Sequence, residues 1–126
     1  MIYLDTHVVV WLYAGLTDKF SDFATSLIND HDLYISPMIR LELQYLYERG
    51  RISEQPEPMI ADLDNLMGVK ICELDFNTVI GCSLKIDWTR DPFDRIIVAH
   101  AAVNQNILLT KDRRILANYE HAQWEE

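Results

Sequence analysis

The sequence has no apolar run long enough to cross a bilayer, which takes roughly 18–20 residues. It also lacks the basic segment followed by a long apolar run that marks a signal peptide. Cysteine is scarce: Cys72 and Cys82 are the only 2, with no histidine at the spacing of a zinc site. We therefore expect a cytoplasmic protein in which both cysteines are reduced core thiols, a disulfide between them being the alternative.

Basic residues are also scarce, because 11 Lys and Arg stand against 20 Asp and Glu and the formal net charge is −9. A protein that coats nucleic acid would carry a basic surface, so this class is not favoured. The charge is uneven: residues 1–84 hold 5 basic and 13 acidic side chains, whereas residues 85–114 hold 6 basic and 4 acidic ones. The second segment would suit a local phosphate-binding site, or a site that bound cations make positive.

The length of 126 residues predicts one domain, residues 1–126, in which short apolar runs alternate with helical periodicity. The apolar runs predict strands at 2–4, 33–35, 69–74, 107–110 and, at an edge, 121–124. The periodic stretches and cap signals predict helices from residue 5 or 6 to about 15, and over 18–30, 38–49, 59–67, 75–85, 91–106 and 115–119. This alternation predicts an α/β sandwich with a mostly parallel sheet, whose ligands bind outside the carboxyl ends of the strands.

The segment Arg90-Asp91-Pro92-Phe93-Asp94-Arg95 is expected to begin a helix, with Asp91 as N-cap and Pro92 at the first helical position. Asp94 lies one turn in, on the row that continues through the apolar residues Ile97, Val98 and Ala101. A carboxylate on this buried row is costly without a counter-charge. The alternative is a variant of the capping box, in which Asp91 and Asp94 accept hydrogen bonds from the first turn.

Glu42 has the same character, because all its neighbours one turn away are apolar: Met38, Ile39, Tyr45 and Leu46. A glutamate on a buried stripe needs a partner or a metal ion, or it takes up a proton. The alternative is a salt bridge to Arg40, Arg49 or a more distant arginine. Taken alone, Asp5 is more often an N-cap and Asp112 more often a polar loop residue.

The four acids Asp5, Glu42, Asp94 and Asp112 would repel one another strongly if they met at the strand ends. Unit charges about 4 Å apart repel by ~4 kcal/mol at an effective dielectric constant near 20, so protons or cations must bind. Oxygen ligands without paired cysteine or histidine favour Mg²⁺ or Mn²⁺ over zinc. One or two such ions suit phosphate-ester chemistry, because they lower the pKa of a water and stabilise charge on the phosphate.

Four motifs in order resemble those of the PIN domain, and most closely those of VapC-type toxins of toxin–antitoxin pairs. They are Asp5-Thr6 after the first strand, Glu42 in the helix after Ser36-Pro37, the segment 90–95, and Leu109-Thr110-Lys111-Asp112. Each motif is short, but together they cover essentially the whole chain. The resemblance implies a three-layer sandwich with a central, mostly parallel sheet of four to five strands.

The resemblance also implies a Mg²⁺- or Mn²⁺-dependent endoribonuclease with Asp5, Glu42, Asp94 and Asp112 as catalytic and metal-binding residues. It implies that Thr6 and Thr110 place hydroxyls beside these acids, and that the chain forms a homodimer and binds a small antitoxin protein. We expect Asp91 to remain a helix cap outside the direct metal ligands. His7 departs from the family, where many members carry a small polar residue, and it is either a packed neutral side chain or a contact to substrate.

Under this hypothesis a metal-activated water attacks phosphorus in line and leaves a 5′-phosphate and a 3′-hydroxyl. Arg95 or Arg113 would hold substrate phosphates, although a helix-surface ion pair explains each equally well. One rival is a phospho-acceptor receiver domain, but only Asp5 stands where receivers carry a pair of acids. A second rival is a PIN-like module that binds RNA or protein without cutting, against which the intact set of four acids argues.

Overall fold

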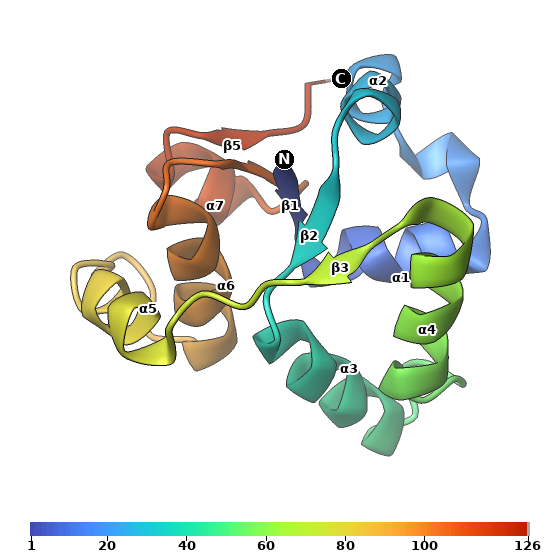
Figure 1. Ribbon diagram of the computed structural model, residues 1–126, viewed down its shortest axis with the longest axis horizontal. Helices are drawn as coiled ribbons and strands as arrows, with labels where there is room; N and C mark the ends of the chain where they lie inside the picture. The colour runs from blue at the N-terminus through green and yellow to red at the C-terminus, as the bar shows by residue number, and fades with distance from the viewer. Residues whose placement is uncertain (126) are drawn as a thin grey trace.

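The computed structural model describes residues 1–125, and its five strands form one sheet in which every neighbouring pair is parallel (Figure 1). The strand order is β3-β2-β1-β4-β5, so that β1 lies at the centre of the sheet. The strands are β1 Ile2–Leu4, β2 Leu33–Ile35, β3 Lys70–Ile71, β4 Ile107–Leu109 and β5 Ala122–Gln123. The predicted α/β fold is therefore confirmed, and the predicted last strand does pair at an edge, beside β4.

Helices cover both faces of this sheet. They are α1 Thr6–Ala14, the short 3-10 helix η1 Thr17–Lys19, α2 Asp22–Asp30, α3 Met38–Glu48, α4 Pro56–Met67, α5 Phe76–Ser83, α6 Pro92–Ala102 and α7 Arg113–Asn118. In Figure 1, α1, α2 and α4 lie to one side of the strands and α5, α6 and α7 to the other. Helix α3 lies beyond the carboxyl ends of the strands and packs against α1, α4 and α6.

Several predicted boundaries are corrected by local hydrogen bonds. The helix predicted over 18–30 is split, because Phe20 is extended and the Ser21 hydroxyl caps α2 by accepting the Ala24 N–H at 3.1 Å. Helix α4 begins at Pro56 rather than residue 59, with proline in the first turn, where its missing N–H costs nothing. The strand predicted over 69–74 pairs with β2 over only Lys70–Ile71.

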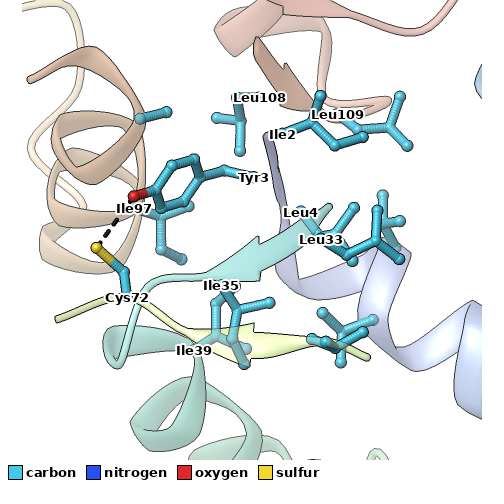
Figure 2. Close-up of a cluster of buried hydrophobic side chains, with 14 of the residues drawn as sticks. Ile2, Tyr3, Leu4, Leu33, Ile35, Ile39, Cys72, Ile97, Leu108 and Leu109 are labelled. Atoms are coloured by element: carbon cyan, nitrogen blue, oxygen red, sulfur yellow. Dashed lines mark hydrogen bonds between the residues drawn. The ribbon is translucent and has the colours of Figure 1, made fainter. Parts of the chain in front are cut away.

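The sheet and the flanking helices enclose the apolar core. Side chains of the strands, such as Ile2, Leu4, Leu108 and Leu109, are fully buried (Figure 2). Burial of each such side chain contributes roughly 1.5–3 kcal/mol, so the short strands are held by packing more than by their few ladder bonds. The Tyr3 hydroxyl donates to Cys72 Sγ at 3.0 Å (Figure 2). Both cysteines are free thiols as predicted, but only Cys72 is a core residue, because Cys82 is half-buried against the core.

The central strands β1 and β4 end side by side, which fixes the place where polar residues collect. Their pairing matches Leu4 with Leu109, and the next N–H, that of Asp5, donates to the Leu109 carbonyl at 3.0 Å. The residues after β1 and after β4 therefore start from one point at the edge of the sheet. Within residues 1–125, every helix is too short or too polar to cross a bilayer.

Candidate active site

Four acidic side chains line one cleft of about 490 Å³ at the carboxyl ends of β1 and β4. Asp5 follows β1, Glu42 lies in α3, Asp94 lies in the first turn of α6, and Asp112 follows β4. The other lining residues are Thr6, His7, Val10, Trp11, Leu46, Arg51 and Ile52. The structure thus brings together the four acids that the sequence singled out.

Asp5 is the most buried of the four acids, with only 5% of its surface exposed. Its Oδ1 accepts the backbone N–H of Thr6 at 2.8 Å, and its Oδ2 accepts the hydroxyl of Thr110 at 2.7 Å. Hydrogen bonds to both oxygens fix the orientation of the carboxylate. As predicted, Asp5 is also the N-cap of α1.

Thr110 connects Asp5 with Asp112, although it is fully buried itself. Its Oγ donates to Asp5 and also accepts the backbone N–H of Asp112 at 3.0 Å. The Oδ1 of Asp112 caps α7 by accepting the N–H groups of Arg114 at 2.9 Å and Ile115 at 3.0 Å. A single hydroxyl therefore sets the spacing between the acids that follow β1 and β4.

Thr6 orients Glu42 in the same way, because its hydroxyl donates to Glu42 Oε1. Burial raises the pKa of Glu42, and the negative charges of Asp5 and Asp91 raise it further, while the Thr6 hydrogen bond opposes both effects. The predicted hydroxyls of Thr6 and Thr110 thus each contact a different acid of the cleft.

The salt-bridge alternative for Glu42 is wrong within the described chain. Arg40 pairs instead with Glu57, at 2.8 Å between Nε and Oε1, and the guanidinium of Arg49 lies over the ring of Tyr45 at 5.6 Å. Throughout residues 1–125 no arginine or lysine pairs with Glu42. Its negative charge therefore remains available to a bound cation.

Asp91 and Asp94 have separate roles at the start of α6. Asp91 is the N-cap, and its Oδ1 accepts the N–H groups of Phe93 at 2.8 Å and Asp94 at 3.4 Å. The capping interpretation is therefore correct for Asp91. The Asp94 side chain takes no part in the cap and faces the cleft instead.

The pKa of Asp94 is raised to about 7. Burial is the largest cause, followed by the negative charges of Asp91, Asp5, Asp112 and Glu42. The charges of all the other acids of the cleft therefore raise the pKa of Asp94. Near neutral pH, a bound proton or cation must relieve the repulsion between these carboxylates.

His7 is held as a neutral side chain. Its Nε2 accepts the backbone N–H of Lys111 at 2.9 Å, so the ring proton belongs on Nδ1, which lies 3.7 Å from Asp5 Oδ2. Burial lowers the pKa of His7, and the ring packs against Trp11 with 4.9 Å between centroids. Of the two interpretations left open by the sequence, the packed neutral side chain matches this geometry.

The arginines that were candidates for holding phosphate do not line the cleft. The Nη2 of Arg95 donates to the carbonyl of Ser83 at 3.0 Å, toward α5, and Arg113 is an exposed residue at the start of α7. Arg51 lines the cleft instead. The sequence carried no signal for it beyond its position directly after Gly50, the residue that follows the C-cap Arg49 of α3.

A hard divalent cation fits the chemistry of this cleft. Carboxylate oxygens are its charged donors, no cysteine lines it, and the Nε2 of the single lining histidine is already engaged by Lys111. Across residues 1–125, no three acidic, histidine or cysteine side chains are close enough to form a ready-made cage. The residues that would hold the ion are Asp5, Glu42, Asp94 and Asp112.

Among solved structures, 11 chains match this fold significantly. One is VapBC2 from Rickettsia felis bound to a DNA fragment from its promoter, with a TM-score of 0.69 and 19% identity over 99% of this chain and 100% of that one. Another is a toxin–antitoxin complex from Klebsiella pneumoniae, with a TM-score of 0.67 and 16% identity over 98% of this chain and 96% of that one. At these identities the likeness establishes the fold.

No curated protein gave a significant match to the sequence. The family model of the PIN domain matches residues 2–121, which is nearly the whole chain and includes all four acids of the cleft. The chain therefore belongs to the PIN domain family.

Proposed function

We propose that this PIN-domain chain is a metal-dependent endoribonuclease that acts as the toxin of a toxin–antitoxin pair. Its reaction would be hydrolysis of an RNA phosphodiester bond with Mg²⁺ or Mn²⁺ as cofactor. The carrying observation is that four acids from four separate segments line one cleft, where their burial and mutual repulsion raise the pKa of Asp94 to about 7.

Such a concentration of like charge destabilises the folded state, so a purely structural role does not explain it. Buried or half-buried carboxylates without ion-pair partners destabilise a fold, and a chain selected only for stability would replace them. The cleft is therefore best explained as a site that is completed by a cation. A divalent ion bound there would lower the pKa of a water and neutralise charge on the phosphate.

The side chains around the acids support this proposal by holding them in fixed positions. The hydroxyls of Thr6 and Thr110 orient Glu42 and Asp5, and the N-cap bonds of Asp112 leave its Oδ2 without a hydrogen bond to any residue in 1–125. The N-terminus of α6 beside Asp94 favours negative charge, whether a carboxylate or a substrate phosphate. Preorganised ligands reduce the reorganisation that binding requires.

The proposed partners follow from the structures that this fold resembles. One of the two structures is a toxin–antitoxin complex, and the other is VapBC2, whose name matches the VapC-type toxins that the sequence motifs resemble. We therefore infer a small antitoxin protein as the physiological partner. We also propose that the chain forms the homodimer that the family resemblance implies.

Cleavage of a panel of structured RNAs by the purified chain with Mn²⁺ tests the enzymatic part. We expect the wild-type chain to cleave, leaving 5′-phosphate ends, and Asp94→Asn to abolish cleavage. Asp62→Asn, which removes an exposed carboxylate of α4, is the matched control and should cleave normally. Equal activity of the wild type and Asp94→Asn would contradict the proposal.

The rival of a non-cleaving PIN-like module predicts RNA or protein binding without cleavage under any metal condition.

Expression in a bacterial host tests the toxin role. The wild-type chain should arrest growth, Asp94→Asn should not, and a small DNA-binding protein from a neighbouring reading frame should relieve the arrest. Growth that the wild-type chain leaves unaffected while it cleaves RNA in vitro would contradict the toxin role alone.

A further inference from the structure

Arg51 lies in the carboxylate cleft but has no role in the proposed cation site. Within the described chain it is the one lysine or arginine that lines this cleft, whose other charged residues are Asp5, Glu42, Asp94 and Asp112. A guanidinium among four carboxylates calls for an explanation, because one positive charge does not neutralise the cleft.

The backbone of Arg51 is anchored to the end of α3. The chain reverses at Gly50, where φ is +72° and glycine is favoured. The N–H of Arg51 then donates to the carbonyl of Leu46 at 2.8 Å. The exposed side chain therefore extends from a fixed base on the helix that also carries Glu42.

Arg51 makes no ion pair with any carboxylate of residues 1–125. This is notable because Glu48 and Glu54 line the neighbouring groove with it, in addition to the acids of the cleft. A structural ion pair would have given the guanidinium a simple role. Its donors remain available to a ligand that carries negative charge.

Arg51 also lies where two cavities meet. The carboxylate cleft shares Val10, Arg51 and Ile52 with a larger groove of about 990 Å³ between α1, the end of α3 and α4. A polymer strand that enters the cleft from this groove would pass the guanidinium before reaching the acids. The groove has about twice the volume of the cleft, so a bound strand has room on the Arg51 side of the acids.

We propose that Arg51 binds a phosphate of the RNA strand adjacent to the phosphate that is cleaved. The planar guanidinium suits this role, because it donates two parallel hydrogen bonds to phosphate oxygens and always carries its charge. It supplies positive charge beside the cleft that does not depend on bound cations. This inference rests on the proposed ribonuclease function and replaces Arg95 and Arg113 as the phosphate contact.

Fluorescence anisotropy with a short fluorescein-labelled single-stranded RNA of mixed sequence tests the role. The Asp94→Asn background prevents cleavage during the measurement, and Arg51→Ala is compared within it across a range of salt concentrations. We expect binding to weaken by about tenfold and the slope of log affinity against log salt to become shallower by about 0.7, the value for one lost contact to a single-stranded phosphate. Arg51→Lys should keep most of the slope but bind more weakly than arginine.

Arg49→Ala is the matched control, because Arg49 is also exposed and two residues away, but its guanidinium lies over the Tyr45 ring and does not line the cleft. It removes the same net charge from the same turn. Equal loss of affinity and slope in Arg49→Ala and Arg51→Ala would overturn the assignment of Arg51. An RNA affinity that neither substitution changes would also overturn the assignment.

A second readout separates phosphate binding from a structural role. In an otherwise wild-type chain, Arg51→Ala should raise KM for RNA while the urea midpoint of unfolding and the affinity for Mn²⁺ do not fall. A fall in Mn²⁺ affinity or in the unfolding midpoint would contradict the assignment. If the wild-type chain neither binds nor cleaves RNA, the proposed function fails together with this inference, whereas cleavage without sensitivity to Arg51 overturns this inference alone.

Discussion

Thr110 and Asp5 are 105 positions apart in sequence, yet the Thr110 hydroxyl donates to Asp5 Oδ2 at 2.7 Å in the interior of the protein. The Thr110 hydroxyl oxygen also accepts the backbone N–H of Asp112 at 3.0 Å. The pairing of β1 with β4 creates this contact, because the two strands end at the same level of the sheet. The side chain of one buried residue thus ties together two of the four acids.

Thr110→Val, which has nearly the same shape, should destabilise the protein by about 1–3 kcal/mol, because it leaves Asp5 Oδ2 and the Asp112 N–H without a partner. It should also weaken Mn²⁺ binding, since the Asp5 carboxylate loses one of its two orienting hydrogen bonds and the backbone of Asp112 loses its link to Asp5. Urea unfolding and calorimetric titration measure the two effects. Thr25→Val, at an exposed position of α2, is the control, and equal behaviour of the two variants would refute this role of Thr110.

Asp94→Asn should stabilise the metal-free protein at alkaline pH. The folded-state pKa of Asp94 is about 7 against an ordinary value of 3.8, so the folded state binds the proton more tightly than the unfolded state. The wild-type chain therefore loses stability as the pH rises from about 4 to about 7. Asparagine lacks this ionisation, so this variant should be more stable near pH 8. Because Asp94 is only half-buried and solvent screens its charge, we expect a difference on the order of 2 kcal/mol, about half of what the full shift would give.

Urea unfolding in the presence of EDTA at a series of pH values checks this effect. The stabilities of the wild type and Asp94→Asn should converge at acidic pH, where both side chains are neutral. A difference that stays constant across the whole pH series would show that Asp94 ionises normally in the folded protein.

His100 should give the opposite pH dependence, because it is buried as a neutral ring on α6. Its Nδ1 lies 2.8 Å from Ser36 Oγ and 3.2 Å from the carbonyl of Ile96, and burial lowers the pKa of the ring. The unfolded state then binds the proton more tightly, so stability should fall as the pH drops below 6.5, the ordinary pKa of histidine.

His100→Asn keeps an amide donor near the position of Nδ1 without a titratable ring. Chains with and without His100→Asn are compared in the Asp94→Asn background. This background removes the opposite pH dependence of stability that Asp94 contributes. We expect the parent to lose stability between neutral and mildly acidic pH and the asparagine variant to lose less. Parallel pH profiles of the two chains would contradict a depressed pKa for His100.

Local patterns in the sequence located the strands and singled out four acids that the structure brings to one cleft. The apolar triplets of β1, β2 and β4 are short and mostly buried, and a polar residue follows each of them. Asp91 marks the start of α6 through its capping carboxylate, and Gly50 marks the turn after α3 through its positive φ. An acid among apolar neighbours one turn away, as at Glu42, is likewise visible without a structure.

The partners of these acids could not be read locally. The Thr6 hydroxyl that contacts Glu42 is 36 residues away in sequence. The residues around Glu42 do not indicate whether its partner is a hydroxyl or an arginine. Arg95 lies next to Asp94 in sequence, but one residue of α-helix turns a side chain by about 100°, so its guanidinium reaches Ser83 instead of the cleft. Arg51 enters the cleft only because α3 packs against α1 beyond the strand ends.

The measurement that tests the central claim most directly is a calorimetric titration of the metal-free chain with Mn²⁺ near pH 8, compared with the Asp5→Asn plus Asp94→Asn double variant. If the four acids form one cation site, the wild type should bind one or two ions and the double variant should lose that binding while remaining folded. Affinity in the wild type should also fall as the pH drops through about 7, where Asp94 takes up its proton. Equal Mn²⁺ binding by both chains, or none by the wild type, would contradict the account.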